Sequence, residues 1–405
     1  MEAPAIGRAS PPEGTPQGGT APAFRPFLRP LLLLTGIFTL NFVSRVVLAP
    51  LLPAIERDLS IGHAAAGGLF FFISMGYCVG LLTSGSVSAR LTHRRTVALS
   101  SVAVGAALCL IALSNGLLGI RGGMTLLGAA AGLYLPSGVA TITNLVPTAT
   151  WGRALAIHEL APNLSFAAAP LLAEALLAWM PWRGCLVAIG LVAMSWGALY
   201  LRFGSGGSFP GAPSNWRSLR PLLRQRPFWV LMALFTLALG MSLGVYAMLP
   251  LYLVAELEFA RPAANSLVAA SRLSGLVMLF ASGWLADRLG ARRTLMLVFS
   301  ATGALTVLLG VLPAPWVLPV VLLQPTLVVC FFPVGFAALS QLGPQAVAFV
   351  VPLAILAGAG GVPAAMGWIA TQSGFAAAMV SVGALTLAGV LVARGLPRHA
   401  GGGGS

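Results

Sequence analysis

The feature that most constrains this sequence is a series of apolar runs, each about 20 residues long. An α-helix needs roughly 20 apolar residues to cross the hydrocarbon core of a bilayer. Hydrophobic residues make up 58% of the chain and charged residues 8%, whereas a soluble domain carries about 25% charged residues. Most of the chain therefore cannot face water, and the sequence predicts an all-α membrane protein.

Twelve such runs can be counted, which predicts twelve transmembrane helices. They lie near residues 31–54, 64–88, 95–115, 122–146, 153–178, 183–202, 227–254, 263–286, 293–312, 315–340, 344–370 and 374–394. The longest polar interruption separates the sixth run from the seventh. We therefore expect a disordered N-terminal tail (1–30), an N-terminal six-helix bundle (31–203), a cytoplasmic central loop (204–226), a C-terminal six-helix bundle (227–396) and a tail with a Gly/Ser linker (397–405).

The arginines indicate how the chain is oriented. Sixteen of the 23 basic residues, all of them Arg, lie in or beside the loops on the side of the chain ends, and four lie on the other side. This asymmetry follows the positive-inside rule and predicts that both termini are cytoplasmic. The bias towards Arg, Ala, Gly and Pro suggests a GC-rich genome, and we expect a multi-pass protein of a bacterial inner (plasma) membrane. The net charge of +14 is spread among apolar runs, so it does not predict nucleic-acid binding.

The sequence lacks motifs of metal-dependent and ATP-driven enzymes. The chain contains no HExxH, Walker or CxxC pattern, and its four cysteines lie in apolar runs. We therefore expect no enzymatic activity, no cofactor and no metal site.

Two loops share a pattern that indicates a duplicated six-helix unit. The segment GSVSARLTHRRTVAL (85–99) follows the second run, and GWLADRLGARRTLML (283–297) follows the eighth. Gly, Arg, Leu, the Arg pair, Thr and Leu stand at matching positions in the two segments. The ends of the first and seventh runs match at nearly the same offset, so the two halves are predicted to be parallel repeats.

With this repeated loop the chain resembles the major facilitator superfamily of secondary transporters over nearly its whole length. The family's signature, Gly-x-x-x-Asp-Arg-x-Gly-x-Arg-Arg, is complete in the second half, whereas Ala89 replaces the Asp and Thr92 the Gly in the first. The resemblance implies two pseudo-symmetric six-helix bundles that give alternating access to a central site, usually in a monomer. It also implies gating by loop residues, namely Gly85, Arg90, Arg94, Gly283, Asp287, Arg288 and Arg292. Alternatively, these arginines only set the membrane topology.

Arg45 and Arg272 lie well inside apolar runs. A guanidinium at the centre of a bilayer costs roughly 2.5–3.5 kcal/mol. In the family that the chain resembles, the first and eighth helices line the central cavity. The first, second, seventh, eighth, tenth and eleventh runs contain no acidic residue that could neutralise the two arginines. We therefore predict that both arginines bind an anionic group of a substrate, because a guanidinium recognises carboxylates and phosphates well. Alternatively, they form structural pairs with Glu159 or Glu174 of the fifth run, or with helix-terminal carbonyl groups.

Four other polar side chains are predicted to complete this site. Asn41 lies one helical turn before Arg45. The hydroxyl of Tyr246 could donate a hydrogen bond to a substrate carboxylate. Tyr134 and Asn144 belong to a polar stripe of the fourth run, which either lines the cavity or holds helices together.

Glu159, with His158 beside it, is predicted to carry a coupling proton, because a carboxyl group or an imidazole inside a membrane can exchange one near neutral pH. Glu159 also lies near the cytoplasmic end of its run, so it could be a simple interfacial carboxylate. Glu174 is placed close to the opposite face and is expected to be half-solvated.

These features together predict a proton-coupled secondary transporter of a small organic anion resembling a monocarboxylate. Its partners would be that anion, protons and the lipid bilayer. One alternative is a proton-driven exporter of amphiphilic drugs or lipids, in which both arginines are structural. Another is a sensor of the same fold that transports nothing.

Overall fold

The computed structural model describes residues 24–213 and 219–396, except for the side chains of 274–277, 279–283 and 286. All regular secondary structure in these ranges is helical. The first half consists of α1 (Arg25–Val46) and α2 (Leu48–Leu59), α3 (His63–Leu91), α4 (His93–Leu113), α5 (Leu117–Gly132) and α6 (Tyr134–Leu145), the short η1 (Thr148–Thr150), α7 (Trp151–Leu177) and α8 (Trp182–Phe203).

The second half follows the same plan. It consists of α10 (Arg226–Leu239), the π-helical turn η3 (Gly240–Gly244) and α11 (Val245–Ala255), α12 (Arg261–Leu289), α13 (Ala291–Val311), α14 (Ala314–Val328) and α15 (Phe331–Ser340), α16 (Pro344–Ala354), the π-helical turn η4 (Ile355–Gly360) and α17 (Gly361–Ala393). Gly374, at φ 84°, interrupts α17 and divides it into two spans.

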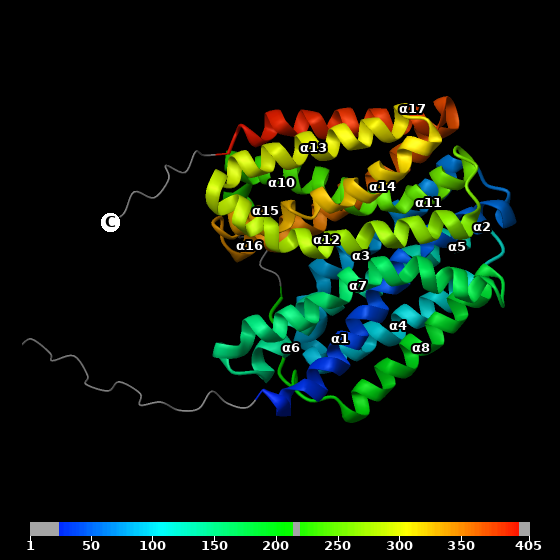
Figure 1. Cartoon of the computed structure of the whole chain (residues 1–405). Coiled ribbons are helices and arrows are strands. Elements are labelled where there is room, and N and C mark those ends of the chain that lie inside the picture. Colours follow the sequence, from blue (N-terminus) through cyan, green and yellow to red (C-terminus); the bar gives the residue numbers. More distant parts are fainter. Residues whose placement is uncertain (1–23, 214–218, 397–405) are drawn as a thin grey trace, which may run out of the picture.

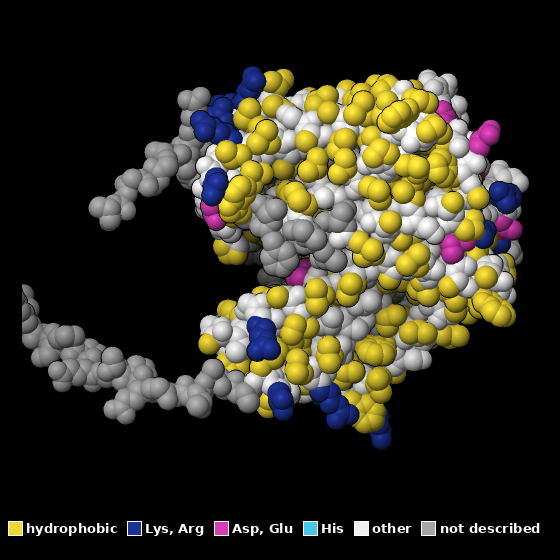
Figure 2. Space-filling view, viewed as in Figure 1, with side chains coloured by type: hydrophobic (Ala, Val, Ile, Leu, Met, Phe, Trp, Pro, Cys, Tyr) yellow, Lys and Arg dark blue, Asp and Glu magenta, His cyan; other side chains and the backbone are white. Residues whose placement is uncertain are grey.

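The described helices confirm an all-α membrane protein with twelve spans. Ten stretches are long and apolar enough to cross a membrane, and one of them, 50 residues long, contains the break at Gly374 and therefore two spans. The 29-residue α12 supplies the remaining span. Figure 2 shows apolar side chains over most of the visible flank of the molecule, as expected of a surface that faces lipid.

Three spans break into two helices for the same reason. Breaks follow Val46, Gly132 and Val328, and a proline (Pro50, Pro136 or Pro333) stands shortly after each break. A proline inside a helix lacks the N–H donor and clashes with the carbonyl group four residues earlier. A proline therefore accounts for the lost hydrogen bond at each break, although α7 accommodates Pro162 and Pro170 without breaking.

The two halves form two bundles that meet on one side and separate on the other (Figure 1). Helices α6 and α15 lie on opposite sides of the gap, at the end of the molecule where both chain ends emerge. The space-filling view is hollowed at the same place (Figure 2). At the closed end α3 packs against α17, where a Cβ on Gly67 would collide with the carbonyl oxygen of Pro363, so only glycine permits this approach.

The predicted boundary of the N-terminal tail differs in the structure. Helix α1 begins at Arg25, inside the predicted tail, because Pro26 suits a helix start and Phe24 packs into the bundle. The central loop contains the short helix α9 (Leu219–Leu223). Residues 1–23 of the predicted tail, 214–218 of the loop and 397–405 of the C-terminal tail lie outside the described residues.

The first part of the central loop is bound to the turn between α3 and α4. The backbone N–H groups of His93 and Arg94 donate to the carbonyl oxygens of Phe209 (3.1 Å) and Gly207 (2.8 Å). The ring of Phe209 also packs on the imidazole of His93, at 4.8 Å between centroids. This segment therefore belongs to the first bundle as a structural element.

Candidate functional site

Arg45, in the last turn of α1, lies where the two bundles meet. Its guanidinium carbon stands 4.2 Å from the ring centroid of Tyr77 and 4.8 Å from that of Phe42. Its buried Nε has no hydrogen-bond partner among the described residues. Cation–π contacts hold this guanidinium in place but leave its Nε donor unbonded.

A cavity of about 50 Å³ adjoins this guanidinium. It lies between α1, α2 and α3 of the first half and α11, η3 and η4 of the second. Phe70, Ile73, Leu243 and Ile355 give it apolar walls. The site is therefore small and apolar, with a single charged side chain in its lining.

Arg272, in α12, is buried and held differently. Its Nη2 donates to the carbonyl oxygen of Ser242 at 3.0 Å. Its guanidinium carbon lies 4.6 Å from the ring centroids of both Phe166 and Tyr246. Ser242 belongs to η3, and π-helical turns of this kind interrupt the regular helical hydrogen bonding and are frequent at functional sites.

An aromatic cluster of Phe42, Phe166 and Tyr246 connects the two arginines. The ring centroids of Phe42 and Phe166, and those of Phe166 and Tyr246, are 5.0 Å apart. Arg45 packs on the Phe42 end of this cluster and Arg272 on the Tyr246 end. The structure thus brings together three of the predicted binding residues, Arg45, Arg272 and Tyr246.

The other three predicted binding residues lie elsewhere. Asn41 points into the first bundle, where its Nδ2 donates to the carbonyl oxygen of Ala131 at 3.0 Å. Ala131 is in the last turn of α5, where helical carbonyl groups lack intrahelical partners. Tyr134 is buried beside His158, and Asn144 is exposed near the end of α6.

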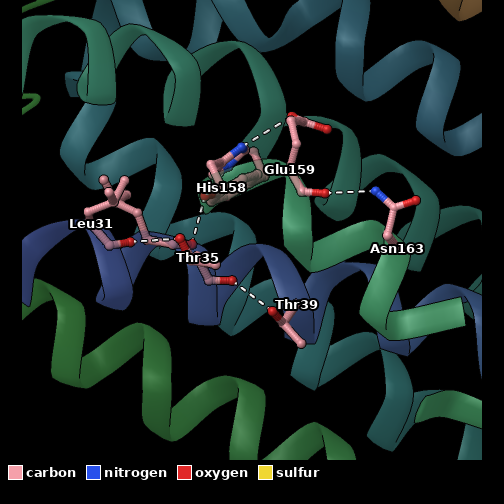
Figure 3. A network of polar contacts seen from close by, with 8 residues as sticks. Leu31, Thr35, Thr39, His158, Glu159 and Asn163 are labelled. Atoms are coloured by element: carbon pink, nitrogen blue, oxygen red, sulfur yellow. Dashed lines mark hydrogen bonds and ion pairs between the residues drawn. The ribbon is translucent and has the colours of Figure 1, made fainter. Parts of the chain in front are cut away.

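His158 connects Tyr134 to Glu159 in one hydrogen-bonded chain. The Tyr134 hydroxyl lies 2.8 Å from the carbonyl oxygen of Leu34 and 3.0 Å from Nε2 of His158. Nδ1 of His158 lies 3.3 Å from Oε1 of Glu159 (Figure 3). The imidazole is fully buried, whereas the Glu159 side chain is 55% exposed. The chain therefore runs from a solvated carboxyl group into the interior of the bundle.

Glu174 joins the two bundles at the closed end. Its Oε1 and Oε2 accept hydrogen bonds from Nε (2.9 Å) and Nη2 (3.2 Å) of Arg261. Nδ2 of Asn265 also donates to Oε1, at 2.6 Å. Since Glu174 belongs to α7 and its two partners to α12, this cluster is a polar lock between the halves.

The ion pair of Glu174 with Arg261 corrects the alternative prediction that Glu159 or Glu174 pairs with Arg45 or Arg272. Neither carboxylate of α7 pairs with Arg45 or Arg272 in the described structure, since Glu159 contacts His158 and Glu174 contacts Arg261. Arg261 is one of the four arginines that were predicted to lie on the side away from the chain ends. The one available signal was Asn265, four residues after Arg261 and therefore on the same helical face.

The predicted gating residues lie at the open end. Arg90 and Asp287 are exposed, and Arg288 stacks on Trp284 at 4.3 Å. Arg94 Nη2 donates to the carbonyl oxygen of Leu201 at 2.7 Å, within its own bundle. Gly85 permits close approach of Ala212 from the central loop; of the other predicted gating residues, Gly283 lies in α12 and Arg292 in α13. In the described part of the chain no ion pair bridges the bundles at this end.

Comparison with known proteins gives one family and several solved structures of similar fold. The family model described as Major Facilitator Superfamily matches residues 34–354. A bacterial homolog of the human lysosomal transporter Spinster, in an inward-facing and occupied conformation, has 14% identity and a TM-score of 0.75, covering 93% of this chain and 97% of that one.

Two further structures show the same fold. A POT family transporter in complex with 5-aminolevulinic acid has 14% identity and a TM-score of 0.75, covering 90% of this chain and 95% of that one. The nucleoside transporter NupG has 14% identity and a TM-score of 0.74, covering 90% of this chain and 99% of that one. Comparison with curated proteins finds no match.

Proposed function

Since the chain belongs to the major facilitator superfamily, we propose that it is a proton-coupled secondary transporter of a small organic anion, of which a monocarboxylate is the expected class. The anion would bind between the two bundles, which would expose it alternately to the two faces of the membrane. We expect a monomer in a bacterial inner membrane.

The observation that carries this proposal is the absence of a carboxylate partner for Arg45 and Arg272 in the described structure. A buried, unpaired charge is strongly destabilising, and a guanidinium cannot lose its proton to escape the penalty. Aromatic rings offset part of this penalty. A bound anion would offset the rest, so the two arginines favour an anionic substrate and disfavour a cationic one.

The two arginines are proposed to have different roles. Both arginines have a buried Nε without a hydrogen-bond partner among the described residues, but only Arg45 lines the cavity, so it would contact the anionic group directly. Arg272 donates to Ser242 and packs against Phe166 and Tyr246, so it would contribute positive electrostatic potential and hold the aromatic side chains in place. The apolar walls suit an acid with a hydrocarbon or aromatic body. The POT family transporter structure with 5-aminolevulinic acid indicates that the fold can accommodate an acid.

Glu159 and His158 are proposed to carry the coupling proton. Glu159 is exposed near the open end of α7, whereas His158 is buried next to it. If both chain ends are cytoplasmic, as the arginine distribution predicts, the open end faces the cytoplasm and the proton site is accessible from that side.

The experiment is a binding test on purified full-length protein in detergent. Thermal unfolding is recorded in the presence of acetate, butyrate or benzoate. The corresponding neutral amides and benzyltrimethylammonium serve as comparisons. A ligand at a hundred times its Kd stabilises the folded state by about 2.7 kcal/mol. We expect stabilisation by at least one acid and none by its amide.

Arginine variants decide where that acid binds. Arg45→Leu should abolish the response, and Arg272→Leu should weaken it. Arg121→Leu is the matched control, because Arg121 also has a buried, unbonded Nε and an aromatic neighbour, Phe72, but does not line the cavity. Stabilisation by the ammonium compound in wild type and both variants would reject the anion proposal and favour the exporter of amphiphilic compounds.

A further inference from the structure

The chain of hydrogen bonds around His158 assigns each imidazole proton to a particular nitrogen. A carbonyl oxygen can only accept, so the 2.8 Å contact with Leu34 requires that the Tyr134 hydroxyl donates its single proton there. The Tyr134 oxygen must then accept from its other neighbour, Nε2 of His158, at 3.0 Å. Nε2 therefore carries a proton whether the imidazole is neutral or charged.

The proton that can be exchanged is consequently the one at Nδ1. In a neutral imidazole protonated at Nε2, Nδ1 has only a lone pair. That lone pair would face the lone pairs of Oε1 of Glu159 at 3.3 Å if the carboxyl group were ionised. The contact becomes a hydrogen bond only when one proton lies between Nδ1 and Oε1.

We propose that His158 and Glu159 form a dyad that holds one exchangeable proton between Nδ1 and Oε1, and that Tyr134 is the positioning residue that fixes this arrangement. The proposal rests on the proposed function and deepens it by setting one proton per transport cycle. In the loaded dyad the proton lies on either atom and the net charge is zero. On unloading it passes from Oε1 to water at the open end, which leaves a neutral imidazole and a carboxylate.

The surroundings of the dyad support a single-proton site. Phe38 of α1 stacks on the imidazole at 4.3 Å with an interplanar angle of 6°, which keeps the ring in the plane that both hydrogen bonds need. The titratable groups that face it are Tyr134 of α6 and, behind it, Tyr200 of α8. Arg153 of α7 packs on Phe24 at 4.5 Å. In the described structure no second carboxyl group contacts the imidazole, so Glu159 is its acidic partner.

The test uses protons alone as the ligand. Full-length protein labelled with ¹⁵N-histidine is purified in detergent, and ¹⁵N NMR reports which ring nitrogens of its four histidines carry protons at each pH. The spectrum of His158→Gln identifies the His158 signals. In wild type we expect Nε2 to stay protonated throughout the titration and Nδ1 to lose one proton in a single step.

Tyr134→Phe tests the positioning role. Losing one hydrogen bond at Nε2 should shift the tautomer ratio of neutral His158 towards Nδ1–H by roughly 2- to 12-fold. Tyr200→Phe is the matched control, because it removes another buried hydroxyl group that has no hydrogen-bond partner among the described residues. It should leave the ratio unchanged.

A wild-type neutral His158 protonated at Nδ1 would overturn the proposal, and this result needs no variant to fold. Equal effects of Tyr134→Phe and Tyr200→Phe would overturn the role of Tyr134. These outcomes are independent of the acid-binding test. Acids that fail to bind while the titration behaves as expected would reject anion transport but keep the dyad.

Discussion

Replacing Glu174 by Gln should release the two bundles from each other at the closed end. The carboxylate receives hydrogen bonds from Nε and Nη2 of Arg261 and from Asn265. Gln keeps the size and one acceptor oxygen but removes the charge and the bidentate geometry. The state that is open at the chain ends, which this lock stabilises, should therefore become less populated.

The magnitude follows from the geometry and exposure of the pair. Hydrogen bonds to charged groups contribute about 1.5–3 kcal/mol each when buried. Here the side chains of Arg261 and Glu174 are 35% and 17% exposed, so solvent screens part of the interaction. A net loss of about 1–3 kcal/mol corresponds to a change of roughly 5- to 150-fold in the ratio of the two conformations.

Distances between spin labels across the open end measure this ratio. Ala149 and Ser340 are exposed on opposite bundles, and each can be replaced by Cys after the four native cysteines have been replaced by Ala. Pulsed electron paramagnetic resonance should show a dominant long distance in wild type. Glu174→Gln should increase a shorter-distance population, corresponding to closure of this end.

Two controls make the result specific. Glu256→Gln removes a carboxylate that accepts from the Phe375 N–H within the second bundle, so it should not change the distances. The double variant Glu174→Gln/Arg261→Gln should shift the ratio no further than Glu174→Gln alone, because Arg261 acts through that carboxylate. A distribution for Glu174→Gln that matches that for Glu256→Gln would refute the lock.

Three further outcomes are expected. In proteoliposomes, Glu159→Gln should abolish uptake of the best-binding acid driven by a pH gradient but leave acid–acid exchange intact; loss of both in a folded variant would contradict a role confined to coupling. Gly128→Ala should destabilise the fold by about 1–3 kcal/mol in thermal unfolding, because its Cβ would collide with the carbonyl oxygen of Ile73, whereas Gly122→Ala on the same helix meets no neighbour and should be neutral or stabilising. Phe209→Ala should speed tryptic cleavage after Arg224 by loosening the central loop from His93; an unchanged rate would show that the backbone hydrogen bonds alone hold the loop.

Much of the fold could be predicted, because a helix that crosses a membrane must be a long apolar segment, and such segments are visible in the sequence. Run length gives the spans, and the repeated loop pattern gives the two halves. A proline follows each of the three helix breaks, but prolines also lie inside unbroken helices such as α7, so their positions alone do not predict the breaks. The π-helical turns η3 and η4 could not be predicted in this way, since they depend on how α10 and α16 pack through Gly240 and Gly358.

Only the charged residues of the site could be predicted from the sequence. Two arginines inside apolar runs required a partner or a ligand, and both lie at one aromatic cluster. Which side chains surround them depends on the rotation of each helix about its axis. Asn41 and Tyr134 consequently form hydrogen bonds inside the first bundle. The partner of Glu174 is Arg261, which lies at the start of α12, far away in the sequence.

The bound central loop also sets a mechanical limit on the movement of the two bundles. The chain is fixed to the first bundle near Gly211, which donates to the Ser88 carbonyl oxygen, and to the second through the buried Leu222. Eight residue steps separate Gly211 from Leu219, where α9 begins, and at no more than 3.6 Å per step they span roughly 29 Å. The loop thus limits how far the two bundles can separate, and inserting residues into it would allow a larger separation.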